Sequence, residues 1–71
     1  MSKQLEVGQQ VSWSWGQGEA AGTLREIHDS TVSITTKGNE VTRHGSEGNP
    51  ALVIEQEDGT KVLKLQSELN D

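Results

Sequence analysis

Apolar and polar residues alternate near the start of the chain. Val11, Trp13 and Trp15 alternate with serines, which is the period of a strand with one buried face. The glycines of residues 16–18 then indicate a turn. We expect Trp13, in the middle of this strand, to lie in the core. Trp15 stands at the strand end, where it is either a second core residue or a partly exposed ring.

A second strand is expected over residues 20–28. Its apolar residues Leu24 and Ile27 are three positions apart, so strict alternation fails between them. An inserted residue or a bend would restore a buried face on both sides of the break. The sequence therefore predicts a bulge or a bend within this strand, followed by a turn over residues 28–30.

The rest of the chain continues the all-β pattern. It predicts strands over residues 31–36, 40–44, 51–56 and 61–65, a loop over residues 45–50, and one helical or 3-10 turn over residues 66–69. Asp58-Gly59, between two apolar runs, is a strong hairpin signal. Many short strands with almost no helix indicate a sandwich or a small barrel, and in so short a chain a bent sheet that closes on itself is the economical solution.

The same pattern gives a set of expected core residues. They are Val11, Trp13, Leu24, Val32, Ile34, Leu52, Ile54, Val62, Leu65 and Leu69. The assignment depends most on register at Leu52 and Ile54, because Val53 occupies the other face of their strand and a slip of one residue would exchange the two sets.

Length and charge restrict the class of protein. The 71 residues are enough for one domain, which we expect over residues 7–69, preceded by a flexible N-terminus over residues 1–6. Six basic residues against eleven acidic ones give a net charge of −5, which disfavours non-specific nucleic-acid binding. The chain shows no signal peptide, no apolar run long enough to span a bilayer and no cysteine. We therefore expect a cytoplasmic protein with no membrane partner.

Residues with catalytic or metal-binding chemistry are sparse. His28 and His44 are the only histidines and there is no cysteine, whereas a zinc site needs three or four ligands. No serine lies in a nucleophile motif, and no glycine-rich phosphate-binding motif is present. We expect no metal, no cofactor, no catalytic residue and no enzymatic activity.

Several segments resemble a known family. Among them are the opening VSWSWG and the close over residues 58–69, DGTKVLKLQSEL, which is the most specific part. On these segments the chain resembles the hypervirulence-associated protein family, whose domain is described as Tudor-like, from about Val7 to Leu69. The resemblance implies an SH3-like barrel of the Tudor group, in agreement with the strand count. We expect five to six short antiparallel strands and a short C-terminal helical turn.

The resemblance does not extend to the aromatic cage by which some Tudor domains bind methylated side chains. A cage needs three or four rings around the cation. Trp15 matches one cage position, but the others correspond to Ala20 or Ala21, Ile34 and Lys37. We therefore do not expect recognition of methylated lysine or arginine.

The remaining hypothesis is a small binding module. Trp15, with Arg25, Lys37 and Arg43, is expected to form a rim on the barrel that recognises a peptide or a protein partner. Two alternatives remain: an assembly role in which the exposed strand over residues 40–44 pairs with another chain, or weak binding of single-stranded nucleic acid, which the acidic charge disfavours. The expected oligomeric state is a monomer or a weak homodimer.

Overall fold

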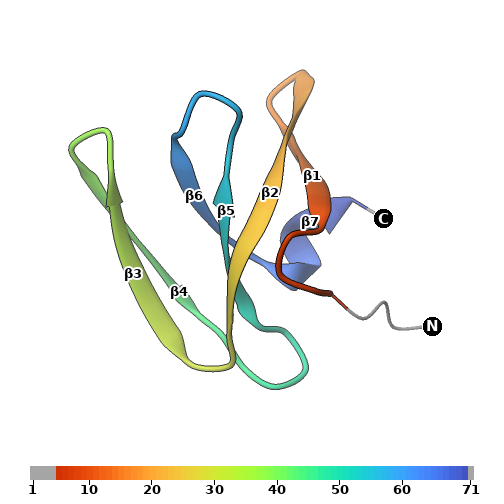
Figure 1. Cartoon of the computed structure of the whole chain (residues 1–71). Coiled ribbons are helices and arrows are strands. Elements are labelled where there is room, and N and C mark those ends of the chain that lie inside the picture. The colour runs from red at the N-terminus through yellow and green to blue at the C-terminus, as the bar shows by residue number, and fades with distance from the viewer. Residues whose placement is uncertain (1–4, 71) are drawn as a thin grey trace.

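The computed structural model describes residues 5–70, which form an all-β domain (Figure 1). Its elements are β1 (Gln10–Trp15), β2 (Gly18–His28), β3 (Thr31–Thr36), β4 (Asn39–His44), β5 (Ala51–Glu55), β6 (Lys61–Leu65), a 3-10 turn (Gln66–Glu68) and β7 (Leu69–Asn70). The predicted fold class is confirmed. The two-residue β7 adds one strand, at the end of the expected helical turn.

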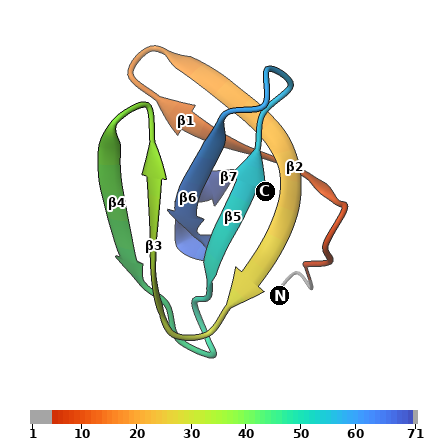
Figure 2. The same ribbon diagram turned by 60° about the vertical axis from the view of Figure 1, so that its left-hand side comes forward.

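The strands form one curled sheet and one separate hairpin. The order in the sheet is β6-β5-β2-β1-β7, and β3 pairs only with β4. After the 3-10 turn the chain returns to pair with β1, while the long strand β2 curves along the whole molecule (Figure 2). β2 and β5 pair directly with each other, so the β3–β4 hairpin is an insertion between two neighbouring strands of the barrel.

The expected irregularity in β2 is a bulge. Leu24 pairs with Ile54, but the next paired residue, Glu26, faces Val53. Arg25 is therefore the extra residue, and the register shift keeps the strand antiparallel to β5 on both sides of it.

The first hydrophobic core lies inside the curl of the sheet. Val11, Trp13, Leu24, Leu52 and Ile54 are buried in it, as predicted. The predicted residues Val62 and Leu69 pack against this cluster but are only partly buried.

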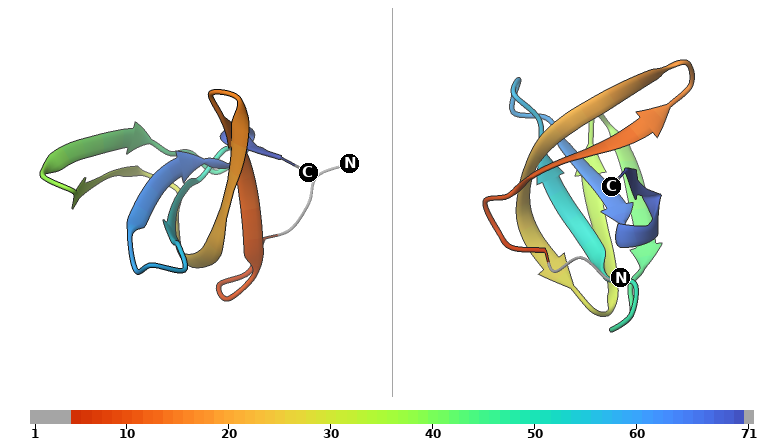
Figure 3. Two further views of the ribbon diagram at one scale, coloured as in Figure 1. Left: turned by 90° about the horizontal axis from the view of Figure 1, so that it is seen from above. Right: turned by 90° about the vertical axis from the view of Figure 1, so that its right-hand side faces the viewer.

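A second core lies on the other side of β5 and β6, where the hairpin covers them. Ala51, Val53 and Leu63 are buried there, and Val32, Ile34, Val41 and Leu65 pack against them partly exposed. Figure 3 shows β5 and β6 between the hairpin and the β1–β2 end of the sheet. The prediction was incomplete here, because it placed only one face of β5 in the core and expected Val32, Ile34 and Leu65 to be mostly buried.

The start of the described chain is attached to the barrel. Leu5 packs against the first core. The Gly8 N–H donates to the carbonyl of Leu24, whose own N–H donates to the carbonyl of Gln9. Of the N-terminus expected to be flexible, residues 1–4 lie outside the described residues. No helix within residues 5–70 has the length and apolar character needed to cross a membrane.

Candidate functional site

The two tryptophans have different environments. Trp13 is 3% exposed and belongs to the first core, whereas Trp15 is 61% exposed. Trp15 ends β1, where its ring lies above Gly18 at the start of β2. Trp13 therefore stabilises the barrel. Trp15 is a surface ring, which agrees with the second of the two alternatives given for it from the sequence.

One surface hollow is a groove between the hairpin and β6. It has a volume of about 350 Å³. The hairpin supplies Thr36, Lys37, Asn39, Val41 and Arg43, and the β5–β6 hairpin supplies Gln56, Thr60, Lys61, Val62, Leu63 and Lys64. We call this hollow the β4–β6 groove.

The β4–β6 groove is cationic, although the chain is acidic. Of the five lysines and arginines within the described residues 5–70, four line it, and none of the described residues that line it is acidic. Val41 and Val62, which are partly exposed, add apolar surface beside these charges, whereas Leu63 is buried. Such a site attracts carboxylates or phosphates attached to a partly apolar ligand.

Arg43 is held in place by the 3-10 turn. Its Nε donates to Glu68 Oε1 at 3.1 Å, and its Nη1 donates to the carbonyl of Thr42 at 3.2 Å. Glu68 Oε1 also accepts a hydrogen bond from the Leu65 N–H at 2.8 Å. Partial burial raises the pKa of Glu68, but the hydrogen bond from Leu65 and the charge of Arg43 outweigh it and lower the pKa below its usual value. Arg43 thus links β4 to the end of β6.

Lys37 lies at the tip of the β3–β4 hairpin. Its φ of 52° and that of Gly38, 80°, are left-handed, as a tight two-residue hairpin turn requires. A neighbouring hollow contains Lys37, Lys61 and Asp58. The pKa of Asp58 is lowered, first by hydrogen bonds from Thr60 and to a smaller extent by the charge of Lys37.

The four predicted site residues do not all meet. Lys37 and Arg43 share the β4–β6 groove, whereas Trp15 and Arg25 do not line it. Arg25 instead pairs with Glu55 at 2.8 Å and lines a separate hollow of about 290 Å³ beside β2. Ligand binding by these four residues stays a prediction.

Lys61 and Lys64 are groove residues that the sequence interpretation missed. Both lie in the short strand β6, which is an edge of the curled sheet. Lysines within an otherwise apolar strand were the available signal, because charges in such a strand mark an edge that is open to solvent.

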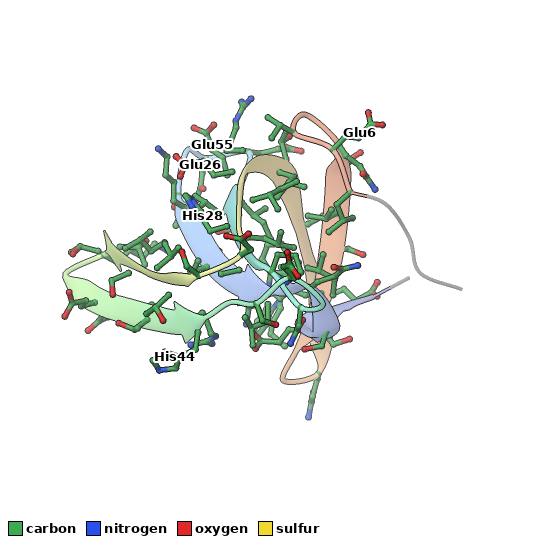
Figure 4. All side chains as sticks on the ribbon, turned by 90° about the horizontal axis from the view of Figure 1, so that it is seen from below. Glu6, Glu26, His28, His44 and Glu55 are labelled. Carbon is green, nitrogen blue, oxygen red and sulfur yellow. The ribbon has the colours of Figure 1, made fainter. Side chains whose placement is uncertain are left out.

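The histidines are far apart and have other neighbours. His28 Nε2 lies 2.7 Å from Glu26 Oε1, and His44 Nδ1 lies 3.1 Å from Thr31 Oγ1. Figure 4 shows His28 beside Glu26 on β2 and His44 on β4 away from both. Within the part of the chain that the structure describes, no three histidines, cysteines or carboxylates come together as metal ligands would.

A family profile matches the chain over the barrel and over both sides of the β4–β6 groove. The profile of the family described as "Hypervirulence associated proteins TUDOR domain" matches residues 8–69. The chain belongs to this family. Tudor-like domains are small binding modules, typically without catalytic activity, and they generally bind proteins or peptides. No curated protein and no solved structure matches the chain.

In this Tudor-like domain, residues of the most specific motif, the close over residues 58–69, make structural contacts. Asn49 Nδ2 donates to Ser67 Oγ at 3.1 Å, and the Ser67 N–H donates to Asn49 Oδ1 at 2.9 Å. Asp58 Oδ1 accepts from the Thr60 N–H at 2.9 Å in the β5–β6 turn. These residues fix loops and turns of the barrel, so the features that identify the family do not by themselves identify its ligand.

The chain cannot build an aromatic cage from its own residues. It contains two tryptophans and no other aromatic residue, and Trp13 is buried. Ile34 and Lys37, at two of the cage positions, lie in β3 and in the turn after it. One exposed ring is fewer than a cage requires.

Proposed function

We propose that this domain is a non-enzymatic module that binds an acidic segment of a protein partner in the β4–β6 groove. The observation that carries the proposal is the concentration of four of the five described cationic side chains around one groove of an acidic protein. Folding has brought these cations together. Because Arg43 is paired with Glu68, Lys37, Lys61 and Lys64 are the charges that a ligand of opposite charge can use.

Its apolar surface favours a peptide as the ligand. The partly exposed Val41 and Val62 lie among the cations, and a peptide can present carboxylates and apolar side chains within a few residues. A long nucleic acid would meet the same cations, but its many phosphates would also face a molecule of net charge −5. A short acidic peptide interacts mainly with the groove itself.

The polar groups of the β4–β6 groove support binding rather than catalysis. They are ammonium, guanidinium, amide and hydroxyl groups, and the described lining residues include no histidine or carboxylate beside a hydroxyl. A nucleophile without a neighbouring base is not activated. The cations therefore serve to hold and orient an anionic partner.

The direct test is a binding titration with a blocked seven-residue peptide in which glutamate and valine alternate. We expect Lys61→Gln to weaken binding about two- to fivefold, because one exposed ion pair contributes about 0.4–1 kcal/mol. Gln17→Glu is the matched control, since it changes the net charge by the same amount at an exposed position in the β1–β2 turn. This control should bind as the unmodified protein does.

Three outcomes would overturn the proposal. One is equal affinity for the version of the peptide with glutamine in place of glutamate. Another is tighter binding of an eight-nucleotide oligothymidylate than of the acidic peptide. The third is peptide binding that is unaffected by Lys61→Gln but changes the fluorescence of Trp15. This result would favour a binding site around the Trp15 ring instead.

A further inference from the structure

We infer that the acidic segment binds by adding a strand to the free edge of β6. This inference rests on the proposed function and specifies how the β4–β6 groove is used. Four consecutive residues, 61–64, line the groove. Alternate side chains of a strand point to opposite faces, so a hollow that touches all four runs along the edge of the strand rather than over one face.

The hairpin forms the other wall in a different way. β4 contributes only alternate residues, Asn39, Val41 and Arg43, which share one face of the strand. The groove thus lies between the face of a hairpin and the edge of a sheet. A chain in this space can pair its backbone with β6 while its side chains contact the hairpin.

Two hydrogen bonds at the ends of the β5–β6 pair show which backbone groups of β6 are directed at β5. The Gln56 N–H donates to the carbonyl of Thr60 at 2.8 Å, and the Gln66 N–H donates to the carbonyl of Pro50 at 2.9 Å. Both fit the antiparallel β5–β6 register. Because bonding alternates along an antiparallel pair, the even-numbered residues of β6 bond to β5. The N–H and C=O groups of Lys61 and Leu63 therefore point away from β5, toward the free edge.

The outward groups of Lys61 and Leu63 are available to another chain. β6 is the terminal strand of its sheet, and within the described residues no hydrogen bond engages these outward groups. At Leu65, which has the same orientation, the N–H already donates to Glu68 Oε1. The 3-10 turn thus limits the open edge to the part of β6 beside the groove.

The charges select the strand that can be added. Lysines on an exposed edge oppose pairing with neutral or basic strands. Carboxylates on the incoming strand convert this repulsion into attraction to Lys61, Lys64 and Lys37. On the side of the hairpin, Val41 provides a partly exposed apolar surface. The geometry thus fits an extended peptide with acidic residues beside an apolar side chain, recognised as in other cases of strand addition.

The test uses the peptide with alternating glutamate and valine, N-methylated at one residue at a time. Strand addition requires that methylation weakens binding about tenfold or more at alternate residues, whose N–H groups face β6, and has little effect at the residues between them. Amide hydrogen exchange of the protein is the second measurement. The peptide should slow exchange at Lys61 and Leu63 and leave Val62 and Lys64, already bonded to β5, unchanged.

The outcomes separate this inference from the proposed function. Binding that depends on Lys61 but tolerates methylation at every residue would overturn strand addition and leave the acidic-peptide function intact. Failure of every acidic peptide to bind would overturn the proposed function itself. Amide protection at the outer edge of β4, or dimers that form without peptide, would show that the chain uses its hairpin for assembly instead.

Discussion

At Gly45 the fold leaves no space for a side chain. A Cβ at this position would lie 2.7 Å from the Ala51 nitrogen and the His28 carbonyl oxygen, and 2.8 Å from the Ser30 carbonyl oxygen. All three atoms belong to the backbone, so none can move without moving a strand end. Glycine is therefore required where the chain leaves the hairpin and returns to the barrel.

Gly45→Ala should destabilise the domain by about 2 kcal/mol, because overpacking against backbone costs about 1–3 kcal/mol. Thermal unfolding followed by circular dichroism measures this, and the expected loss in Tm is about 10 °C. Gly48→Ala is the control in the same loop, since a Cβ there meets nothing within 4 Å. Equal stability of the two variants would show that the contacts at Gly45 are not limiting.

Glu68 gives the stability of the domain a dependence on pH. Its pKa is lower in the folded protein than its usual value, so its contribution is complete above about pH 4.3 and is lost as the pH falls through the lower, folded pKa. Glu68→Gln should lower the free energy of unfolding by about 1 kcal/mol at pH 7, because it removes the ion pair with Arg43. The loss is no larger because both partners are about one-third exposed and solvent weakens the pair.

Urea unfolding of the unmodified protein and of Glu68→Gln, at pH 7 and at pH 3, tests this contribution. The difference between the two proteins should shrink at the lower pH, where the carboxyl group becomes protonated. A difference that stays constant would mean that packing, and not the charge of Glu68, accounts for the loss.

At the scale of elements, the β3–β4 hairpin is the least supported part of the fold. None of its residues is buried. It pairs with no other strand, and it is held through one partly buried face. β5 differs, because its residues from Ala51 to Ile54 are all buried. The hairpin should therefore open while the curled sheet remains folded.

Native-state hydrogen exchange should show this opening directly. We expect the amides that bond β3 to β4 to exchange with a lower free energy than those that bond β2 to β5. Ile34→Ala should lower the free energy of the hairpin opening more than it lowers that of the sheet. A single free energy for all strands would mean that the hairpin and the barrel unfold together.

The elements were more predictable than their contacts. Alternation in β1 and turn residues such as Asp58-Gly59 are local signals, and β1 to β6 lie within two residues of their expected bounds, whereas β7 was not expected. The burial of Val53 and Leu63 was not predictable in this way. It depends on the hairpin folding back over the outer face of β5 and β6, a contact between distant segments that no local period specifies.

At the scale of the whole molecule, the candidate site was predictable only in part. The sequence predicts Lys37 and Arg43 as site residues near the barrel rim, and both line the groove, but the predicted residues Trp15 and Arg25 do not. Lys61 and Lys64 join the groove because the hairpin, inserted before β5, packs next to the last long strand. Positions that meet only through this packing share no signal in the sequence. The net charge of the whole chain is acidic, so it gives no indication of the local excess of cations in the groove.

In the proposed binding mode, the insertion of the hairpin divides the contacts to the ligand between two separate segments of the chain. β2 and β5 remain paired as far as His28 and Ala51, so the segment between them leaves and re-enters the barrel at adjacent points. The barrel alone supplies the backbone edge of β6, while the inserted segment supplies one wall of side chains. Exchange of this segment would redirect selectivity without rebuilding the scaffold, much as interchangeable loops do on other small domains.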